Sequence, residues 1–132
     1  PTADEMRIAI DNDKKFAVMA QMPDIFRRAF GSGLMPQRSD VINFGNLRIQ
    51  NPANGLILVD GVKVNLISGA SALVRASNTG AELSTLFEAP TQAELVELMR
   101  TVIGFLRPFE ATAGLDLGAL ARQFEALGGQ FK

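Results

Sequence analysis

The chain has 132 residues, which fits one domain, because domains most often contain about 100–150 residues. Hydrophobic residues make up 47% of the sequence and charged residues 20%, so a packed core is expected. Cysteine, histidine, tryptophan and tyrosine are all absent. The chain alone therefore cannot build a disulfide, a thiolate or imidazole metal site, or a Ser-His-Asp or Cys-His catalytic group. The net charge of −1 is not typical of a nucleic-acid-binding protein, so we expect no direct contact with nucleic acid.

The sequence shows no recognisable targeting segment. No basic stretch precedes an apolar one near residue 1, so no signal peptide is predicted. The longest apolar runs have about five residues, whereas a membrane span needs about 20, so no membrane contact is predicted. Pro1 is the residue that removal of an initiator methionine would leave. We expect a cytoplasmic protein or a component of a virion.

The first 30 residues contain two different apolar patterns. Met6, Ile8 and Ile10 alternate with mostly polar residues, which predicts that residues 1–12 form a short strand or an ordered arm. From Phe16 onward, the apolar spacing becomes helical. We expect two short helices, or one helix kinked at Pro23, with an apolar stripe and an end at Gly31. The members of this stripe are Phe16, Met19, Ala20, Phe26, Ala29 and Phe30.

Residues 31–40 are glycine-rich and polar, which predicts a loop before the sheet. The strongest strand signals follow, around Phe44 to Ile49 and on both sides of Asp60-Gly61. Asp-Gly is typical of a two-residue hairpin loop because both positions need a positive φ angle. The predicted cross-strand partners are Val59 with Val62 and Ile57 with Val64. Another strand is expected at 73–75, while 81–88 is ambiguous between helix and strand.

The clearest helix begins after Thr91. Thr91 and Glu94 form a capping box, in which each side chain can satisfy a free backbone amide. Pro108 is expected to end or kink this helix, and residues 111–114 to connect it to a last helix, capped by Asp116 and ended by Gly128. The apolar stripe of the first helix contains Leu95, Leu98, Met99, Val102, Leu106 and Phe109, and that of the last contains Leu117, Leu120, Ala121, Phe124 and Leu127.

This order of elements predicts the α+β class, because strands and helices do not alternate regularly. We expect a single domain over residues 1–132. It would hold a small, mostly antiparallel sheet with a central Asp60-Gly61 hairpin, an N-terminal helical segment, and two C-terminal helices packed on one face.

Several groups of residues are candidates for chemistry. An N-terminal proline can act as a general base at the start of a buried strand, but residues 2–5 are too polar to predict one. Glu94 and Glu97 lie three residues apart on a helix and could act as a carboxylate pair, although capping already explains Glu94. Arg27-Arg28 lies beside Phe26 and Phe30, as in single-strand nucleic-acid binders. Core packing of both rings is the preferred interpretation.

Large apolar side chains outside the helical stripes indicate contacts between chains if they are exposed. The leading hypothesis is therefore a non-enzymatic assembly protein that binds copies of itself or other assembly proteins. A phage-like virion head, decoration or tail component is the best guess, with no cofactor and no metal. The alternatives are a small-molecule-binding or regulatory module with an apolar pocket between sheet and helices, and a small enzyme using Pro1 or carboxylates. The predicted interface residues are Met6, Ile8, Ile10, Met35, Phe44, Leu56, Leu58 and Phe131.

Overall fold

The computed structural model describes residues 1–30, 41–44, 47–50, 56–58, 61–76 and 80–130. In chain order the elements are β1 (Thr2–Ala9), α1 (Lys15–Phe30), β2 (Val41–Phe44), β3 (Leu47–Gln50), β4 (Leu56–Leu58), β5 (Gly61–Asn65), β6 (Ser71–Ala76), β7 (Glu82–Glu88), α2 (Gln92–Leu106), α3 (Pro108–Ala113) and α4 (Gly118–Ala126). The predicted loop at 31–40 lies outside the described residues.

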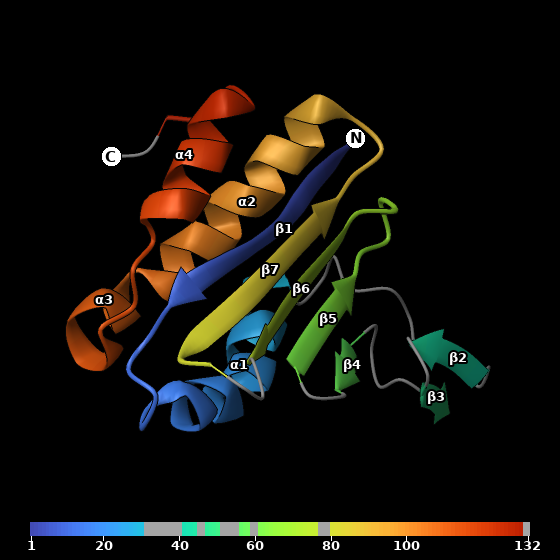
Figure 1. Cartoon of the computed structure of the whole chain (residues 1–132). Helices are drawn as coiled ribbons and strands as arrows, with labels where there is room; N and C mark the ends of the chain where they lie inside the picture. Colours follow the sequence, from blue (N-terminus) through green and yellow to red (C-terminus); the bar gives the residue numbers. More distant parts are fainter. Residues whose placement is uncertain (31–40, 45–46, 51–55, 59–60, 77–79, 131–132) are drawn as a thin grey trace.

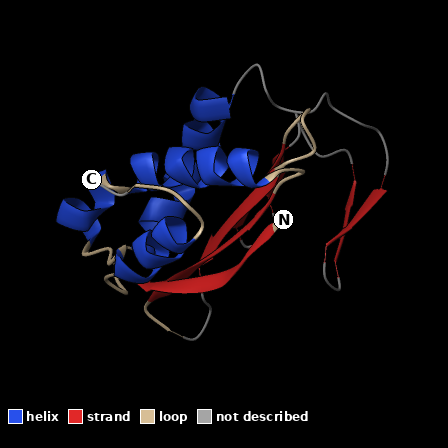
Figure 2. Cartoon of the chain, turned by 90° about the horizontal axis from the view of Figure 1, so that it is seen from above, coloured by secondary structure: helices blue, strands red, loops and turns tan. Residues whose placement is uncertain are grey.

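Five strands form one sheet in the order β1-β7-β6-β5-β4, and each neighbouring pair is antiparallel (Figure 1). β2 and β3 form a separate two-stranded antiparallel sheet. The helices cover one face of the five-stranded sheet (Figure 2). α4 packs on β1, α2 on β7, and α1 on β5 and β6. The predicted α+β class is confirmed.

The first residues of the chain belong to the sheet. β1 pairs with β7, with Ala3 opposite Phe87 and Ile8 opposite Leu83, and a β-bulge lies between Ala3 and Met6. Ala3, Ile8 and Ile10 are buried in the core. Of the two alternatives for this segment, the strand is the one that the structure contains.

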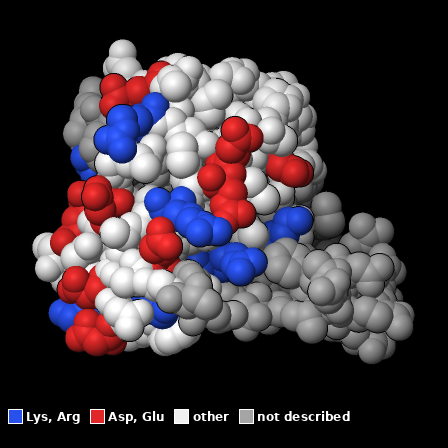
Figure 3. All heavy atoms as spheres, in the orientation of Figure 1, with Lys and Arg blue, Asp and Glu red and all other residues white. Residues whose placement is uncertain are grey.

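The two faces of the sheet differ in chemistry. Residues that alternate along β5, β6 and β7 are buried beneath the helices, namely Val62, Val64, Ala72, Val74, Leu83, Thr85 and Phe87. None of the described helices lies over the opposite face, where Leu73 and Leu86 form a half-buried pair in register. Basic and acidic side chains are interspersed over this face (Figure 3). An antiparallel sheet commonly leaves one face in water in this way.

The β4–β5 pairing corrects the predicted register. Leu58 lies opposite Val62 and Ile57 opposite Lys63. The predicted pairs, Val59 with Val62 and Ile57 with Val64, are therefore each wrong by one position. Gly61 already belongs to β5, where it pairs with Arg75 of β6. A Cβ at Gly61 would lie 2.6 Å from the Val74 carbonyl oxygen. The glycine is therefore needed for close strand approach.

The N-terminal helical segment is one helix, because α1 continues through Pro23. Its buried residues are Lys15, Val18, Met22 and Phe26, which follow the spacing of one helical face. The predicted stripe is therefore partly wrong, since Phe16 is 63% exposed and Ala20 and Ala29 are exposed.

Lys15 lies within the buried face because its polar end is satisfied. Its Nζ donates to the Gly80 carbonyl at 2.6 Å. The long stem can pack among apolar side chains while the ammonium group reaches this acceptor. Because lysine does not count as an apolar residue, the apolar pattern could not show that this position is buried. The predicted buried face of α1 therefore differs from the observed one.

The start of α2 confirms the Thr91 half of the predicted capping box. Thr91 is the N-cap residue, and its Oγ1 accepts a hydrogen bond from the Glu94 amide at 3.2 Å. All six residues of the predicted stripe are buried. The helix ends at Leu106, and Pro108 occupies the first turn of α3, where a missing amide hydrogen costs nothing.

The connection expected at 111–114 is largely helical instead. α3 extends to Ala113, and Gly114 ends it with a φ of 63°. Asp116 acts just before α4, where its Oδ1 accepts from the Gly118 amide at 2.9 Å, although Leu117 is the N-cap residue. Among the described helices, none has the length and apolar character needed to cross a bilayer.

Candidate binding groove

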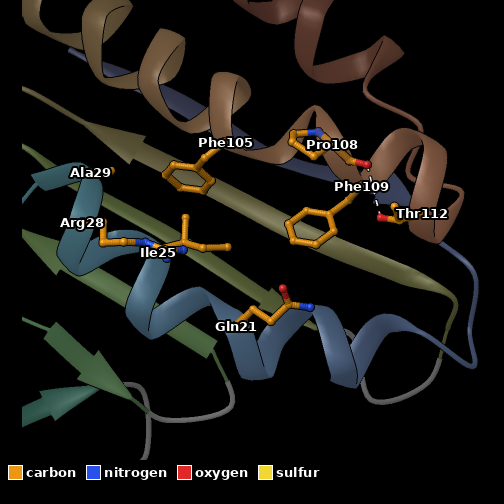
Figure 4. Close-up of a pocket in the computed structure, with 8 residues that line it drawn as sticks. All are labelled: Gln21, Ile25, Arg28, Ala29, Phe105, Pro108, Phe109 and Thr112. Atoms are coloured by element: carbon orange, nitrogen blue, oxygen red, sulfur yellow. Dashed lines mark hydrogen bonds between the residues drawn. The ribbon is translucent and has the colours of Figure 1, made fainter.

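A groove with a volume of about 690 Å³ lies between α1 and the α2–α3 corner (Figure 4). α1 forms one wall, while the last turn of α2 and α3 form the other. The lining residues are Gln21, Ile25, Arg28, Ala29, Phe105, Pro108, Phe109 and Thr112.

Aromatic side chains form the α2–α3 wall. Phe105 comes from the last turn of α2 and Phe109 from the first turn of α3, and both rings point toward α1 (Figure 4). Residues four apart lie on the same side of an α-helix, and the two rings keep this common direction on either side of Pro108, the first residue of α3. The Phe105 ring packs against Phe26, which is fully buried, with 5.0 Å between ring centroids. The wall is thus anchored in the core.

The polar side chains that line the groove differ in the hydrogen bonds and ion pairs that they make within the protein. The Thr112 hydroxyl donates to the Pro108 carbonyl at 3.2 Å. The side-chain amide of Gln21 donates to the Ala17 carbonyl at 3.3 Å. Arg28 is exposed and makes no ion pair or hydrogen bond with any other residue that the structure describes. Its neighbour Arg27 instead pairs with Asp24 at 3.2 Å.

This combination has the form of a small-molecule site. Ligand sites are concave, have volumes of about 300–1,000 Å³, and combine apolar walls with a few polar groups. In the described part of the chain, acidic side chains do not gather in any group of three or more that could hold a metal ion. The groove can therefore offer apolar contact and one guanidinium group to a ligand.

The structure separates the predicted interface residues. Ile8 and Ile10 are buried in the chain's own core, so they are not available at the surface of this fold, and Met6 is half-buried on β1. Met35 and Phe131 lie outside the described residues. Phe44, Leu56 and Leu58 belong to β2 and β4, but their side chains lie outside the described part.

The two candidate carboxylates lie beside a second, smaller cavity of about 260 Å³, which Glu94 and Glu97 line together with Thr101. Glu94 lies in the capped first turn of α2. The Glu97 carboxylate pairs with Arg100, and the Thr101 hydroxyl donates to the Glu97 carbonyl. These bonds are structural ones within α2.

Pro1 lies at the start of an edge strand. Its carbonyl accepts a hydrogen bond from the Ala89 amide at 3.0 Å. In the segment that follows, Thr2, Asp4 and Glu5 are exposed and only Ala3 is buried. The strand that begins after Pro1 is therefore not buried along its length.

Sequence reasoning missed the groove. In the sequence, Arg27-Arg28 stands out only as part of a basic–aromatic cluster, and the predicted core position of Phe26 is correct. The signal for the groove was Pro108 between Phe105 and Phe109, which shows that two aromatic residues flank a helix break. Their position opposite Arg28 depends on the packing of α1 against α3, and no local pattern encodes it.

The sequence matches no protein-family model and no curated protein.

Proposed function

We propose that this protein is a non-enzymatic binding module, and that its ligand site is the groove between α1 and the α2–α3 corner. The observation that supports the proposal most directly is the concave apolar wall of Phe105 and Phe109, supported by buried Phe26. Most ordinary gaps between helices are filled by side chains, because protein interiors are close-packed. A groove of about 690 Å³ beside two aromatic rings leaves apolar surface that a ligand would cover.

The test uses a neutral apolar dye and a variant that fills the groove. Nile red should gain fluorescence and saturate with the native protein, and Ala29→Trp should abolish saturable binding, because Ala29 lines the groove and is exposed. Ala20→Trp is the matched control, since Ala20 is also exposed on α1 but does not line the groove.

Equal binding by both tryptophan variants, or no binding by the native protein, would contradict the proposal. Thermal unfolding of each variant, followed by circular dichroism, checks that the fold is intact. The absence of native tryptophan and tyrosine leaves no competing intrinsic emission from these residues in the native protein.

An assembly role is the second candidate, and the uncovered sheet face supports it. Leu73 and Leu86 lie there as adjacent, half-buried side chains in the middle strands of the sheet. In a phage-like head, decoration or tail subunit, such a face would pack against a neighbouring subunit. Multi-angle light scattering should then give an oligomer, and replacing both leucines by glutamine should lower its mass. A native monomer at all accessible concentrations, tested without other assembly proteins, would argue against self-assembly.

A further inference from the structure

We propose that the groove binds a single-chain carboxylate amphiphile, with the carboxylate on Arg28 and the hydrocarbon chain against Phe105 and Phe109. This inference rests on the proposed function, because it names the chemistry of the ligand at the same site. Two observations lead to it: the distribution of polar and apolar atoms in the groove, and the guanidinium group of Arg28, with which no described residue pairs.

The shape of the groove favours an elongated ligand. Its α1 wall runs from Gln21 to Ala29, which corresponds to about 12 Å at the rise of an α-helix. Ile25 lies between these ends, and Phe105 and Phe109 face it from the other wall (Figure 4). A flexible hydrocarbon chain can follow such a path and remove apolar surface from water, which is the main favourable term in burying it.

The charge in the groove favours an anion. Arg28 is the only cation among the eight lining residues, and no residue that the structure describes pairs with it. None of these eight residues carries a carboxylate. A guanidinium group binds a carboxylate through two parallel hydrogen bonds. One guanidinium group matches the single charge of a carboxylate better than the near-double charge of a phosphate monoester.

Competition between matched ligands tests the inference. Decanoate and decanol have the same number of carbon atoms and differ chiefly in their head groups, so their ability to displace Nile red reports the contribution of the charge. Below its micelle concentration, decanoate should bind about tenfold more tightly than decanol, since one charged hydrogen-bonded pair accounts for a factor of this size. Added salt should reduce the difference.

Arg28→Gln should bring the ratio of decanoate to decanol affinity close to one. Arg28→Lys should retain part of the ratio, because it keeps the charge but loses the planar fork. Arg27→Gln is the matched control and should leave the ratio unchanged, since Arg27 is the adjacent arginine, pairs with Asp24 and does not line the groove.

The outcomes separate this inference from the proposed function. If decanol and decanoate displace the dye equally, and Arg28→Gln changes nothing, the groove is a ligand site but the carboxylate inference is wrong. If Nile red does not bind at all, the proposed function fails. If the dye signal falls as the protein forms dimers, a second copy occupies the groove, and the inference is overturned.

Discussion

Two glycines in the C-terminal helices have opposite roles. Gly104 lies inside α2, is exposed, and faces open space where a Cβ would be. Gly114 has a φ of 63°, and a Cβ there would meet the Asp11 carboxylate. The backbone conformation at Gly114 disfavours any other residue, whereas the one at Gly104 does not require glycine.

Exchange of each glycine for alanine should therefore give opposite results. Gly104→Ala should raise the free energy of unfolding by about 0.5–1 kcal/mol, since glycine is a poor helix former. Gly114→Ala should lower it by at least about 1 kcal/mol, through the left-handed backbone and the clash. The shift of the urea midpoint measures both changes. Two shifts of the same sign would contradict the assigned roles.

Two phenylalanines on α1 should also differ in their contribution to stability. Phe26 is fully buried and contacts both Phe30 and Phe105, whereas Phe16 is 63% exposed. Phe26→Ala should lower the free energy of unfolding by about 3–5 kcal/mol, because it leaves a cavity. Phe16→Ala should change it by less than about 0.5 kcal/mol. Calorimetric melting of the two variants provides the comparison, and equal destabilisation would place the buried face of α1 elsewhere.

At the scale of elements, the cap of α2 connects a local sequence signal to stability. Thr91→Ala should lower the free energy of unfolding by about 1 kcal/mol, because the Glu94 amide loses its acceptor. Thr91→Ser keeps a hydroxyl and should retain most of that stability. Urea titrations of the two variants measure the difference, and equal losses in both would show that the methyl group, not the hydroxyl, is responsible.

The sequence predicted elements well where one local signal dominated. The apolar stripe of α2 and its threonine cap follow from spacing and hydrogen bonding within a single helix, so they needed no knowledge of the rest of the fold. The buried face of α1 was harder to predict from the sequence, because Lys15 occupies a core position by reaching the Gly80 carbonyl. That acceptor lies far away in the sequence, and only the packed structure brings it there.

Strand register was the least predictable feature. Asp60-Gly61 matches a two-residue turn, yet the close approach of Gly61 to Val74 and Arg75 places this glycine inside β5. Both residues belong to β6, so the register of the β4–β5 hairpin depends on a third strand. The groove was also not predictable from a local pattern, because it depends on how α1 and α3 pack together.

At the scale of the whole molecule, β1 cannot be treated as a detachable arm. It supplies Ala3 and Ile8 to the core, and its edge is tied to the C-terminal region. The Asp116 amide donates to the Ala9 carbonyl at 2.8 Å, and the Gln123 side chain donates to the Asp4 carbonyl at 2.9 Å. These bonds satisfy part of an edge that would otherwise be open to pairing with another chain.

Deletion of residues 1–9 should therefore unfold the protein and not simply block assembly. It would remove core side chains and expose the edge of β7, which favours aggregation. Circular dichroism and light scattering of the truncated chain measure both effects. A folded, monomeric truncated protein would show that β1 is dispensable, contrary to its burial.

The pairing of β1 with β7 also has a consequence for synthesis of the protein. Thr2 pairs with Glu88, so β1 leaves the ribosome before its partner β7 and must wait for it. At about 5–20 residues per second, this delay is on the order of ten seconds. During that time Ile8 and Met6 belong to an unpaired strand. The exposed charges of Asp4, Glu5 and Arg7 would then act as gatekeepers that keep the nascent strand from aggregating.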